Sequence, residues 1–307
     1  MNKLRLLILG LLATLLTGCS LEDERDECCY QIRLHYHETV DGVDLFQQDI
    51  KSMRHLLYDS EGRFVRWIES PAGHPQDVDI SDLESGAYTV VTVANATDKT
   101  LFENYDQLST FRLIHNARYQ DSAKDDDYGN SDELYWHMTG FTIDGSPQII
   151  DCPLSNIHCH LHVRAAWTGI PRQVGQWTMR LYDVYTGYQT GEVGLTVRDR
   201  DFPAQVSAMC TQRVGTSVFN FELECEFITF RWTNEVLPTL QIWCDDEPVT
   251  KGMDLAKAFQ EWGWYPDRAQ IQEYWIDLTI HDDGSVDMRQ GGSLGIRDWI
   301  DGGTISN

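Results

Sequence analysis

The strongest single indication of fold in this 307-residue chain is the sequence Leu83-Glu84-Ser85-Gly86-Ala87-Tyr88-Thr89-Val90-Val91-Thr92-Val93-Ala94-Asn95. Gly86 lies in a turn before Thr89–Val93, a run rich in β-branched residues, which favour strands because they pack well on a pleated surface. The run is almost continuously apolar and does not alternate with polar residues. We therefore expect a strand that is buried on both faces.

The flanking sequence predicts many further short strands. Tyr30–His37 alternates apolar and polar residues, which is typical of a strand with one buried face. Asp59-Ser60-Glu61-Gly62 and Asp282-Asp283-Gly284-Ser285 supply the Asp and Gly residues of two hairpin turns. Other strands are predicted at Met53–Tyr58, Phe64–Ile68, Leu134–Trp136, Ile157–Trp167, Trp177–Tyr185, Val218–Trp232, Leu240–Cys244 and Tyr274–Ile280.

Helical patterns are few. The clearest is Met253–Trp262, where Leu255, Phe259 and Trp262 lie on one face of a helix. A shorter helix is predicted around Tyr105–Leu113. We therefore expect a mainly all-β chain with one or two short helices, built as two β-sandwiches in series, an N-terminal one at 29–146 and a C-terminal one at 147–307.

The N-terminus has the pattern of a bacterial lipoprotein signal. Lys3 and Arg5 precede a short apolar run that ends in Leu16-Thr17-Gly18-Cys19. This pattern predicts a signal peptide at 1–18, cleavage between Gly18 and Cys19, and a covalent N-terminal lipid at Cys19, made of diacylglycerol and acyl chains such as palmitate. An ordinary cleaved signal with an incidental cysteine is the alternative.

Residues 19–28 form an acid-rich segment that we interpret as a solvated tether. The chain has a formal net charge of −24, and the signal peptide carries only positive charges, so the mature chain is more acidic still. Such a surface repels nucleic acid and anionic lipid headgroups. Attachment to a membrane must therefore come from the lipid on Cys19.

The cysteine content leaves disulfide pairing open. If Cys19 carries lipid, an odd number of thiols remains, and no CxxC motif indicates a zinc ribbon or a redox site. A bridge between Cys152 and Cys159 and a set of buried, inert thiols are both compatible with the sequence. The residues concerned are Cys28, Cys29, Cys152, Cys159, Cys210, Cys225 and Cys244.

His158, His160 and His162 alternate along one predicted strand. They are expected on one face, with Cys159, Leu161 and Val163 on the core side. Histidines at alternate strand positions can hold a metal through neutral imidazoles. No downstream acidic motif of known ligand spacing completes the set, so a polar outer face or an inter-domain surface is the simpler interpretation.

No motif indicates catalysis. The acidic loop 125–132 has its glycine at the fifth position and not the sixth, and no glutamate follows at the twelfth, so it does not match a calcium loop of the EF-hand type. There is no G-x-S-x-G sequence, so a hydrolase triad is unsupported, and no nucleotide-binding motif occurs. The aromatic cluster 262–265 fits a core cap or a partner interface better than a sugar platform. We expect no enzyme, no catalytic residue, no cofactor apart from the covalent lipid, and no small-molecule substrate.

Several of these motifs occur in the order found in one known family. They are Cys29-Tyr30-Gln31-Ile32, then Leu57-Tyr58-Asp59-Ser60-Glu61-Gly62-Arg63-Phe64-Val65, then Leu83 through Asn95, then Tyr274-Trp275-Ile276-Asp277-Leu278 with Ile296-Arg297-Asp298-Trp299. In this order and spacing the chain resembles the FimB-like anchor lipoproteins of type V fimbriae in Bacteroidales. Ser85 stands where that family often has proline, which changes the stiffness of the turn.

The resemblance implies two transthyretin-like sandwiches and a lipid-anchored protein exposed on the outer membrane. It would attach a strand-exchanged fimbria to the cell, limit its length and contact the shaft subunits. Because an anchor must keep its lipid, we expect it to retain its first strand, uncut at Arg25 or Arg33. The surface for the first shaft subunit is expected in 274–307, with Tyr274, Trp275, Ile296 and Trp299 as the interface. A surface glycan-binding lipoprotein of a polysaccharide-utilisation system is the alternative.

Overall fold

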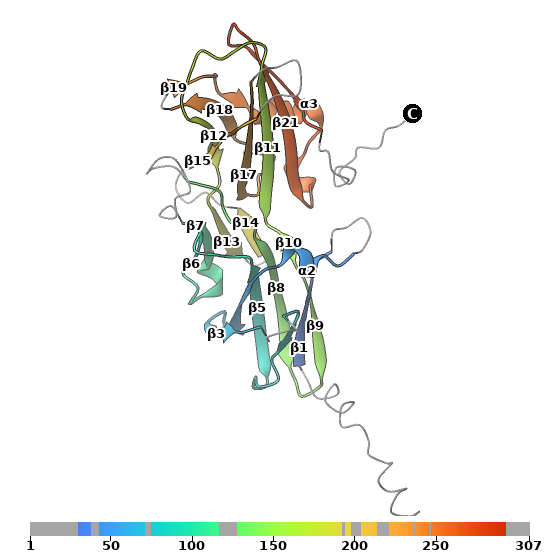
Figure 1. The fold of residues 1–307 in the computed structure, drawn as a ribbon. Coiled ribbons are helices and arrows are strands. Elements are labelled where there is room, and N and C mark those ends of the chain that lie inside the picture. Colours follow the sequence, from blue (N-terminus) through green and yellow to red (C-terminus); the bar gives the residue numbers. More distant parts are fainter. Residues whose placement is uncertain are drawn as a thin grey trace, which may run out of the picture.

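The computed structural model describes residues 30–37, 43–70, 75–116, 128–191, 194–197, 204–213, 221–235, 237–245 and 247–292. Two β-rich halves stack end to end, with β1 and β9 in the lower half and β11, β17 and β21 in the upper half (Figure 1). The mainly all-β fold expected from the sequence is confirmed.

The elements follow in chain order. The first half contains β1 (Tyr30–His35), α2 (Phe46–Asp49), β2 (Met53–Asp59), β3 (Phe64–Ile68), β4 (Asp77–Asp79), β5 (Gly86–Ala94), β6 (Thr100–Glu103), η1 (Leu108–Thr110), β7 (Arg112–His115), β8 (Tyr135–Ile143), β9 (Gln148–Pro153) and β10 (Ser155–Asn156). The second half contains β11 (His158–Trp167), β12 (Trp177–Val184), β13 (Gly187–Gly191), β14 (Gly194–Val197), β15 (Ala204–Met209), β16 (Thr211–Arg213), β17 (Glu222–Phe230), β18 (Thr239–Cys244), β19 (Glu247–Pro248), β20 (Met253–Asp254), α3 (Leu255–Trp262), η2 (Pro266–Arg268), β21 (Gln272–Ile280) and β22 (Val286–Gln290).

Strand β5 is buried on both faces, as its apolar run predicts. It pairs with β2 on one side and β8 on the other, within a sheet of order β10-β8-β5-β2-β3. Val90 and Ala94 pack into the core beneath this sheet, whereas Val91 and Val93 pack into a second core above it. The first half therefore has three layers, and β5 lies in the middle one.

The two outer layers of the first half have different origins. One is the sheet β4-β1-β9, in which β1 runs antiparallel to β4 and parallel to β9. The other is the sheet β14-β13-β7-β6, which combines two strands of the first half with the β13–β14 hairpin of the second. This hairpin joins the halves through backbone hydrogen bonds.

The expected boundary between residues 146 and 147 differs from this arrangement. Strands β9 and β10 lie beyond it and still pair with β1 and β8. Ile150 and Cys152 of β9 are buried in the core of the first half. Ser146-Pro147 therefore belongs to the turn between β8 and β9, and the first sandwich continues to Asn156.

Apart from the β13–β14 hairpin, the second half is a two-sheet sandwich. The sheet β16-β17-β11-β21-β22 faces the sheet β15-β12-β18-β19, to which β20 adds through β18. Their inward side chains form one core, and Leu255 and Phe259 of α3 join it with 0% exposure. Helix α3 begins after Asp254, whose side chain accepts from the Ala256 and Lys257 amides, and ends at Gly263 with φ of 74°.

Two helix predictions need correction in detail. The expected helix from Met253 starts at Leu255, because Met253 and Asp254 pair with β18. The expected helix at Tyr105–Leu113 is wrong: only the 3-10 turn η1 forms there, and β7 begins at Arg112. The apolar residues of that stretch serve a strand buried against β5, so their spacing does not reflect a helix.

Two of the cysteines that could have bridged lie in different cores. Cys152 is buried in the first half and Cys159 in the second, and neither forms a disulfide. The suggested bridge between them is wrong, because neighbouring positions in the chain here enter separate domains. Burial raises the pKa of the Cys152 thiol to about 12, so it behaves as a small apolar side chain.

Candidate functional site

The first strand is locked into the first half. Ile32 and Leu34 of β1 are 0% and 1% exposed, and the backbone is paired along both edges. The Tyr30 hydroxyl accepts hydrogen bonds from the Gly145 amide at 2.7 Å and the Asp144 amide at 3.1 Å. Strand β1 therefore lies between β4 and β9 and covers the core of the first half with its inward side chains.

A second notable surface is the outer face of the sheet in the second half. Here β11 contributes His160 and His162, β17 contributes Glu226, and β21 contributes Trp275. Glu226 Oε1 lies 3.1 Å from His160 Nδ1 and 3.8 Å from His162 Nδ1. The hydrogen bond from His160 lowers the pKa of Glu226, so this carboxylate is ionised at neutral pH.

His158 is separated from the other two histidines by burial. Its Nδ1 lies 2.9 Å from the Leu134 carbonyl oxygen, and its Nε2 lies 3.1 Å from the Asn156 side-chain nitrogen. Burial lowers the pKa of His158 to about 3, so it stays neutral. Both ring nitrogens are already engaged. His158 is therefore not available to the metal site suggested for the three histidines, whereas Cys159 and Leu161 do face the core as expected.

The expected partner-interface residues do not lie together. Tyr274 is 5% exposed and stacks on Trp232 in the core at 5.8 Å between ring centroids, so it offers no surface to a partner. Trp275 points to the opposite face and stacks on His162 at 3.8 Å. Ile296 and Trp299 lie outside the described residues.

A groove of about 1010 Å³ runs over this outer face. Its lining combines His162, Glu226 and Trp275 with Asn130 from the segment that leads into β8. Asn130 is fixed to β17, because its amide nitrogen donates to the Glu226 carbonyl oxygen at 3.1 Å and its oxygen accepts from the Ile228 amide at 3.0 Å. The groove therefore lies where the two halves meet.

Sequence reasoning missed the acidic residues beside the histidines. Glu226 faces His162 because β17 runs antiparallel to β11, and Glu273 follows from the parallel pairing of β21 with β11. The sequence did hold a signal: Glu222, Glu224 and Glu226 alternate with core residues just as the histidines do. Pairing these two alternating stretches would have placed acids and histidines on one face.

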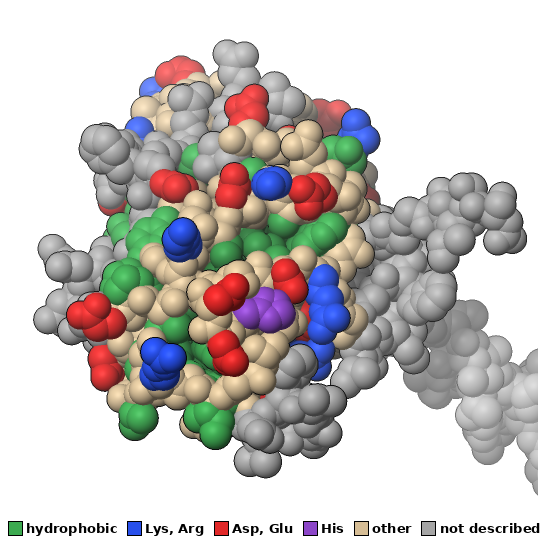
Figure 2. Space-filling model, turned by 90° about the horizontal axis from the view of Figure 1, so that it is seen from above, with side chains coloured by type: hydrophobic (Ala, Val, Ile, Leu, Met, Phe, Trp, Pro, Cys, Tyr) green, Lys and Arg blue, Asp and Glu red, His purple; other side chains and the backbone are tan. Residues whose placement is uncertain are grey.

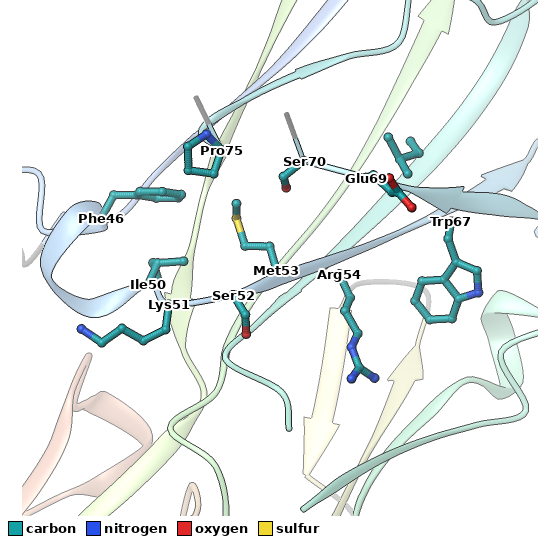
Figure 3. A pocket seen from close by; sticks show the side chains of 11 residues that line it. Phe46, Ile50, Lys51, Ser52, Met53, Arg54, Trp67, Glu69, Ser70 and Pro75 are labelled. Atoms are coloured by element: carbon teal, nitrogen blue, oxygen red, sulfur yellow. The ribbon is translucent and has the colours of Figure 1, made fainter. Parts of the chain in front are cut away.

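A smaller pocket of about 560 Å³ lies in the first half between α2 and the strands β2 and β3. Phe46, Ile50, Met53 and Pro75 give it apolar walls, with Trp67 at its far end (Figure 3). Trp67 is 39% exposed, the only tryptophan in the described ranges classed as exposed. Edge-on contacts with Phe102 and other aromatic rings hold its plane in place.

On the end-on face drawn in Figure 2, acidic side chains are scattered among basic and apolar ones, and no basic patch dominates.

Tyr265 of the 262–265 cluster is 47% exposed, whereas Trp262 and Trp264 pack against the core. The cluster thus serves mainly as a core cap, the simpler of the two interpretations.

The lipidation signal with Gly18 and Cys19 lies outside the described residues. Within the described ranges, no helix is both long and apolar enough to cross a membrane.

One comparison identifies a family, and solved structures share the fold. A family model described as fimbrillin-A associated anchor proteins Mfa1 and Mfa2 matches residues 25–300. The solved structure of the fimbrial anchor protein Mfa2 from Porphyromonas gingivalis superposes with a TM-score of 0.59 at 13% identity, covering 85% of this chain and 94% of that one. A search of curated protein sequences found no match.

Two further solved structures share the fold. A Bacteroides thetaiotaomicron protein described as a candidate adhesin has a TM-score of 0.64 at 12% identity, covering 85% of this chain and 96% of that one. Another from the same organism, described as a candidate polysaccharide-binding protein, has a TM-score of 0.63 at 12% identity, covering 87% and 99%.

Proposed function

The chain belongs to the family of fimbrillin-A associated anchor proteins, and on this basis we propose that it fastens a fimbria to the outer membrane. In this proposal the lipid on Cys19 holds the protein in the membrane, and the folded halves stand on the outer face of the cell. The protein joins the first shaft subunit and limits the length of the filament.

The observation that carries this proposal is the family match along residues 25–300. The packing of the first strand supports it. A shaft subunit that assembles by strand exchange needs a groove open to a neighbour's strand, because backbone hydrogen bonds and side-chain pockets hold the donated segment. Here β1 occupies its own groove, with Ile32 and Leu34 buried. A chain that keeps this strand stays connected to its lipid.

Arg33 lies within this protected strand. Its neighbours Ile32 and Leu34 are core residues, its backbone pairs with β4 and β9, and its Nε lies 3.2 Å from Asp77 Oδ1. A protease needs the peptide bond in an accessible segment, so paired backbone inside a sheet is a poor substrate. We expect N-terminal sequencing of the protein from purified fimbriae to show no species that begins after Arg25 or Arg33. Mature protein beginning after either arginine would contradict the anchor role.

The contact with the shaft is proposed at the C-terminal segment 274–307. Strand β22 supports this placement, because in the described residues it pairs only with β21 and lies at the edge of its sheet. An edge strand presents unpaired backbone groups that can accept another strand. Deletion of residues 290–307 removes the end of β22 and all of the chain that follows it. We expect the shortened protein to remain in the membrane while fimbriae pass into the medium; unchanged fimbrial retention would contradict this placement.

The pocket beside Trp67 favours a second candidate, binding of surface glycan. Aromatic faces stack on sugars, and Arg54, Lys51 and Glu69 supply polar groups at the same site. A glycan-binding protein should retain polysaccharide in a pull-down and lose it on Trp67→Ala, with Trp243→Ala, a half-buried tryptophan away from the pocket, as control. Co-purification with shaft subunits, unaffected by Trp67→Ala, favours the anchor.

A further inference from the structure

The outer face of the second sandwich carries a cluster of two histidines and a glutamate. His160 and His162 extend from β11, and Glu226 extends toward them from β17. One ring nitrogen of each histidine and one oxygen of Glu226 all lie within 4.8 Å of one another. We propose that these three side chains bind a divalent transition-metal ion, with zinc as the ion that suits them best.

The spacing is close to that of a bound site. Zinc holds imidazole nitrogens at about 2.0–2.1 Å and carboxylate oxygens at about 2.0–2.2 Å, so tetrahedral ligand atoms lie roughly 3.4 Å apart. The distances from Glu226 Oε1 to the two histidine Nδ1 atoms, 3.1 and 3.8 Å, fall on either side of this value. Small side-chain rotations therefore bring all three atoms around one ion, and water completes the coordination.

Each histidine has a carboxylate behind it. His160 Nε2 lies 3.9 Å from Glu133 Oε1, and His162 Nε2 lies 3.7 Å from Glu273 Oε1. Metal-ligating histidines commonly donate their other ring nitrogen to a carboxylate, which fixes the tautomer and strengthens the ligand. Here both Nε2 atoms face acids while both Nδ1 atoms face Glu226. His162 Nε2 is buried and makes no hydrogen bond, so closer approach to Glu273 also satisfies it.

The ring planes are held by packing. His162 stacks on Trp275 with 3.8 Å between ring centroids and 12° between planes. His160 contacts the buried His158 ring edge-on at 5.0 Å. Both ligand rings are thus oriented before the ion arrives, which lowers the entropy lost on binding.

A simple ion pair does not require this arrangement. His281 and Asp287 illustrate such a pair on the same sheet, with one imidazole and one carboxylate 2.9 Å apart. In the cluster, a single Glu226 oxygen faces two imidazoles and two more carboxylates stand behind them. Ligands from two strands, β11 and β17, converge there, and an ion at this point would cross-link these strands in the groove between the halves.

The test is calorimetric titration of the purified full chain, in mild detergent, with ZnCl₂. We expect one ion per chain, a higher unfolding temperature with zinc, and at least about 10-fold weaker binding in His160→Ala and in the nearly isosteric Glu226→Gln. Glu273→Gln, which alters only the supporting acid, should weaken binding by about 10- to 100-fold. His281→Ala is the matched control and should bind like the parent. Co²⁺ bound in place of zinc should show no thiolate charge-transfer absorption.

Failure of the parent chain to bind zinc would overturn the proposal, as would equal affinity in the parent and Glu226→Gln. A cobalt–thiolate band would assign the ion to the cysteines and also overturn it. If His160→Ala fails to fold, Glu226→Gln carries the comparison. These measurements use purified protein without fimbriae, so their outcome does not depend on whether the protein anchors a fimbria.

Discussion

Replacing Tyr188 with phenylalanine should weaken the junction between the two halves. Tyr188 lies on β13, the strand that the second half contributes to the sheet with β7. It is 3% exposed and stacks on Phe230 at 4.8 Å. Its hydroxyl donates to the Ile157 carbonyl oxygen and accepts from the Arg231 amide at 2.9 Å. Tyr188 thus ties β13 to the linker before β11 and to the end of β17.

The substitution keeps the ring and removes both hydrogen bonds. The Ile157 carbonyl and the Arg231 amide then lose the partner that the tyrosine supplied. Each buried polar group left unsatisfied costs about 1–3 kcal/mol, so we expect the two groups together to lower the free energy of unfolding by about 2–6 kcal/mol. With urea m-values of about 2–3 kcal/mol per M for a chain of this size, the midpoint should fall by about 1–2 M.

The assay is urea unfolding followed by tryptophan fluorescence, with Tyr265→Phe as the control. Tyr265 is 47% exposed, so removing its hydroxyl should change the free energy of unfolding by less than about 0.5 kcal/mol. A Tyr188→Phe variant as stable as the control would refute the assignment of this hydroxyl as a structural link between the halves.

Other predictions concern protonation and helix capping. Burial lowers the pKa of His55 to about 4, so the unfolded chain binds protons more readily below pH 6.5 and stability falls as the pH drops from about 6.5 to 4. In His55→Gln, the pH dependence of the unfolding free energy over this window should shrink by up to about 1.4 kcal/mol per pH unit; an unchanged slope would contradict the buried neutral histidine. Asp254→Ala removes the cap that accepts from the Ala256 amide at 2.9 Å and should cost about 1 kcal/mol by thermal unfolding, with Glu261→Ala near the other end of α3 as a nearly neutral control.

The parts of the fold set by local pattern could be predicted from the sequence. Thr89–Val93 indicated burial on both faces, and β5 does lie between two cores. Leu255 and Phe259 likewise identified the face of α3 that enters the core. In these cases the period of the apolar residues reports directly which faces are covered.

The parts set by long-range pairing could not be predicted in the same way. The β13–β14 hairpin joins the sheet of β7, about 75 residues earlier in the chain, and nothing local in Gly187–Gly191 specifies that partner. Similarly, Glu226 joins His160 and His162 only through the register of β17 on β11. His158 shares the alternation of its neighbours but is buried at the junction of the halves, where Leu134 and Asn156 engage its ring.

The anchor role is tested most directly by measuring how fimbriae divide between cells and medium in a strain carrying Cys19→Ala. Without the lipid, the folded protein should detach from the outer membrane. Fimbriae should then be shed or overlong, while the shaft subunits still fold and polymerise. Immunoblots of cell and medium fractions, with Cys210→Ala as the matched cysteine control, provide the measurement. Fimbriae of normal length that stay on Cys19→Ala cells would contradict the proposal that this chain anchors them through its lipid.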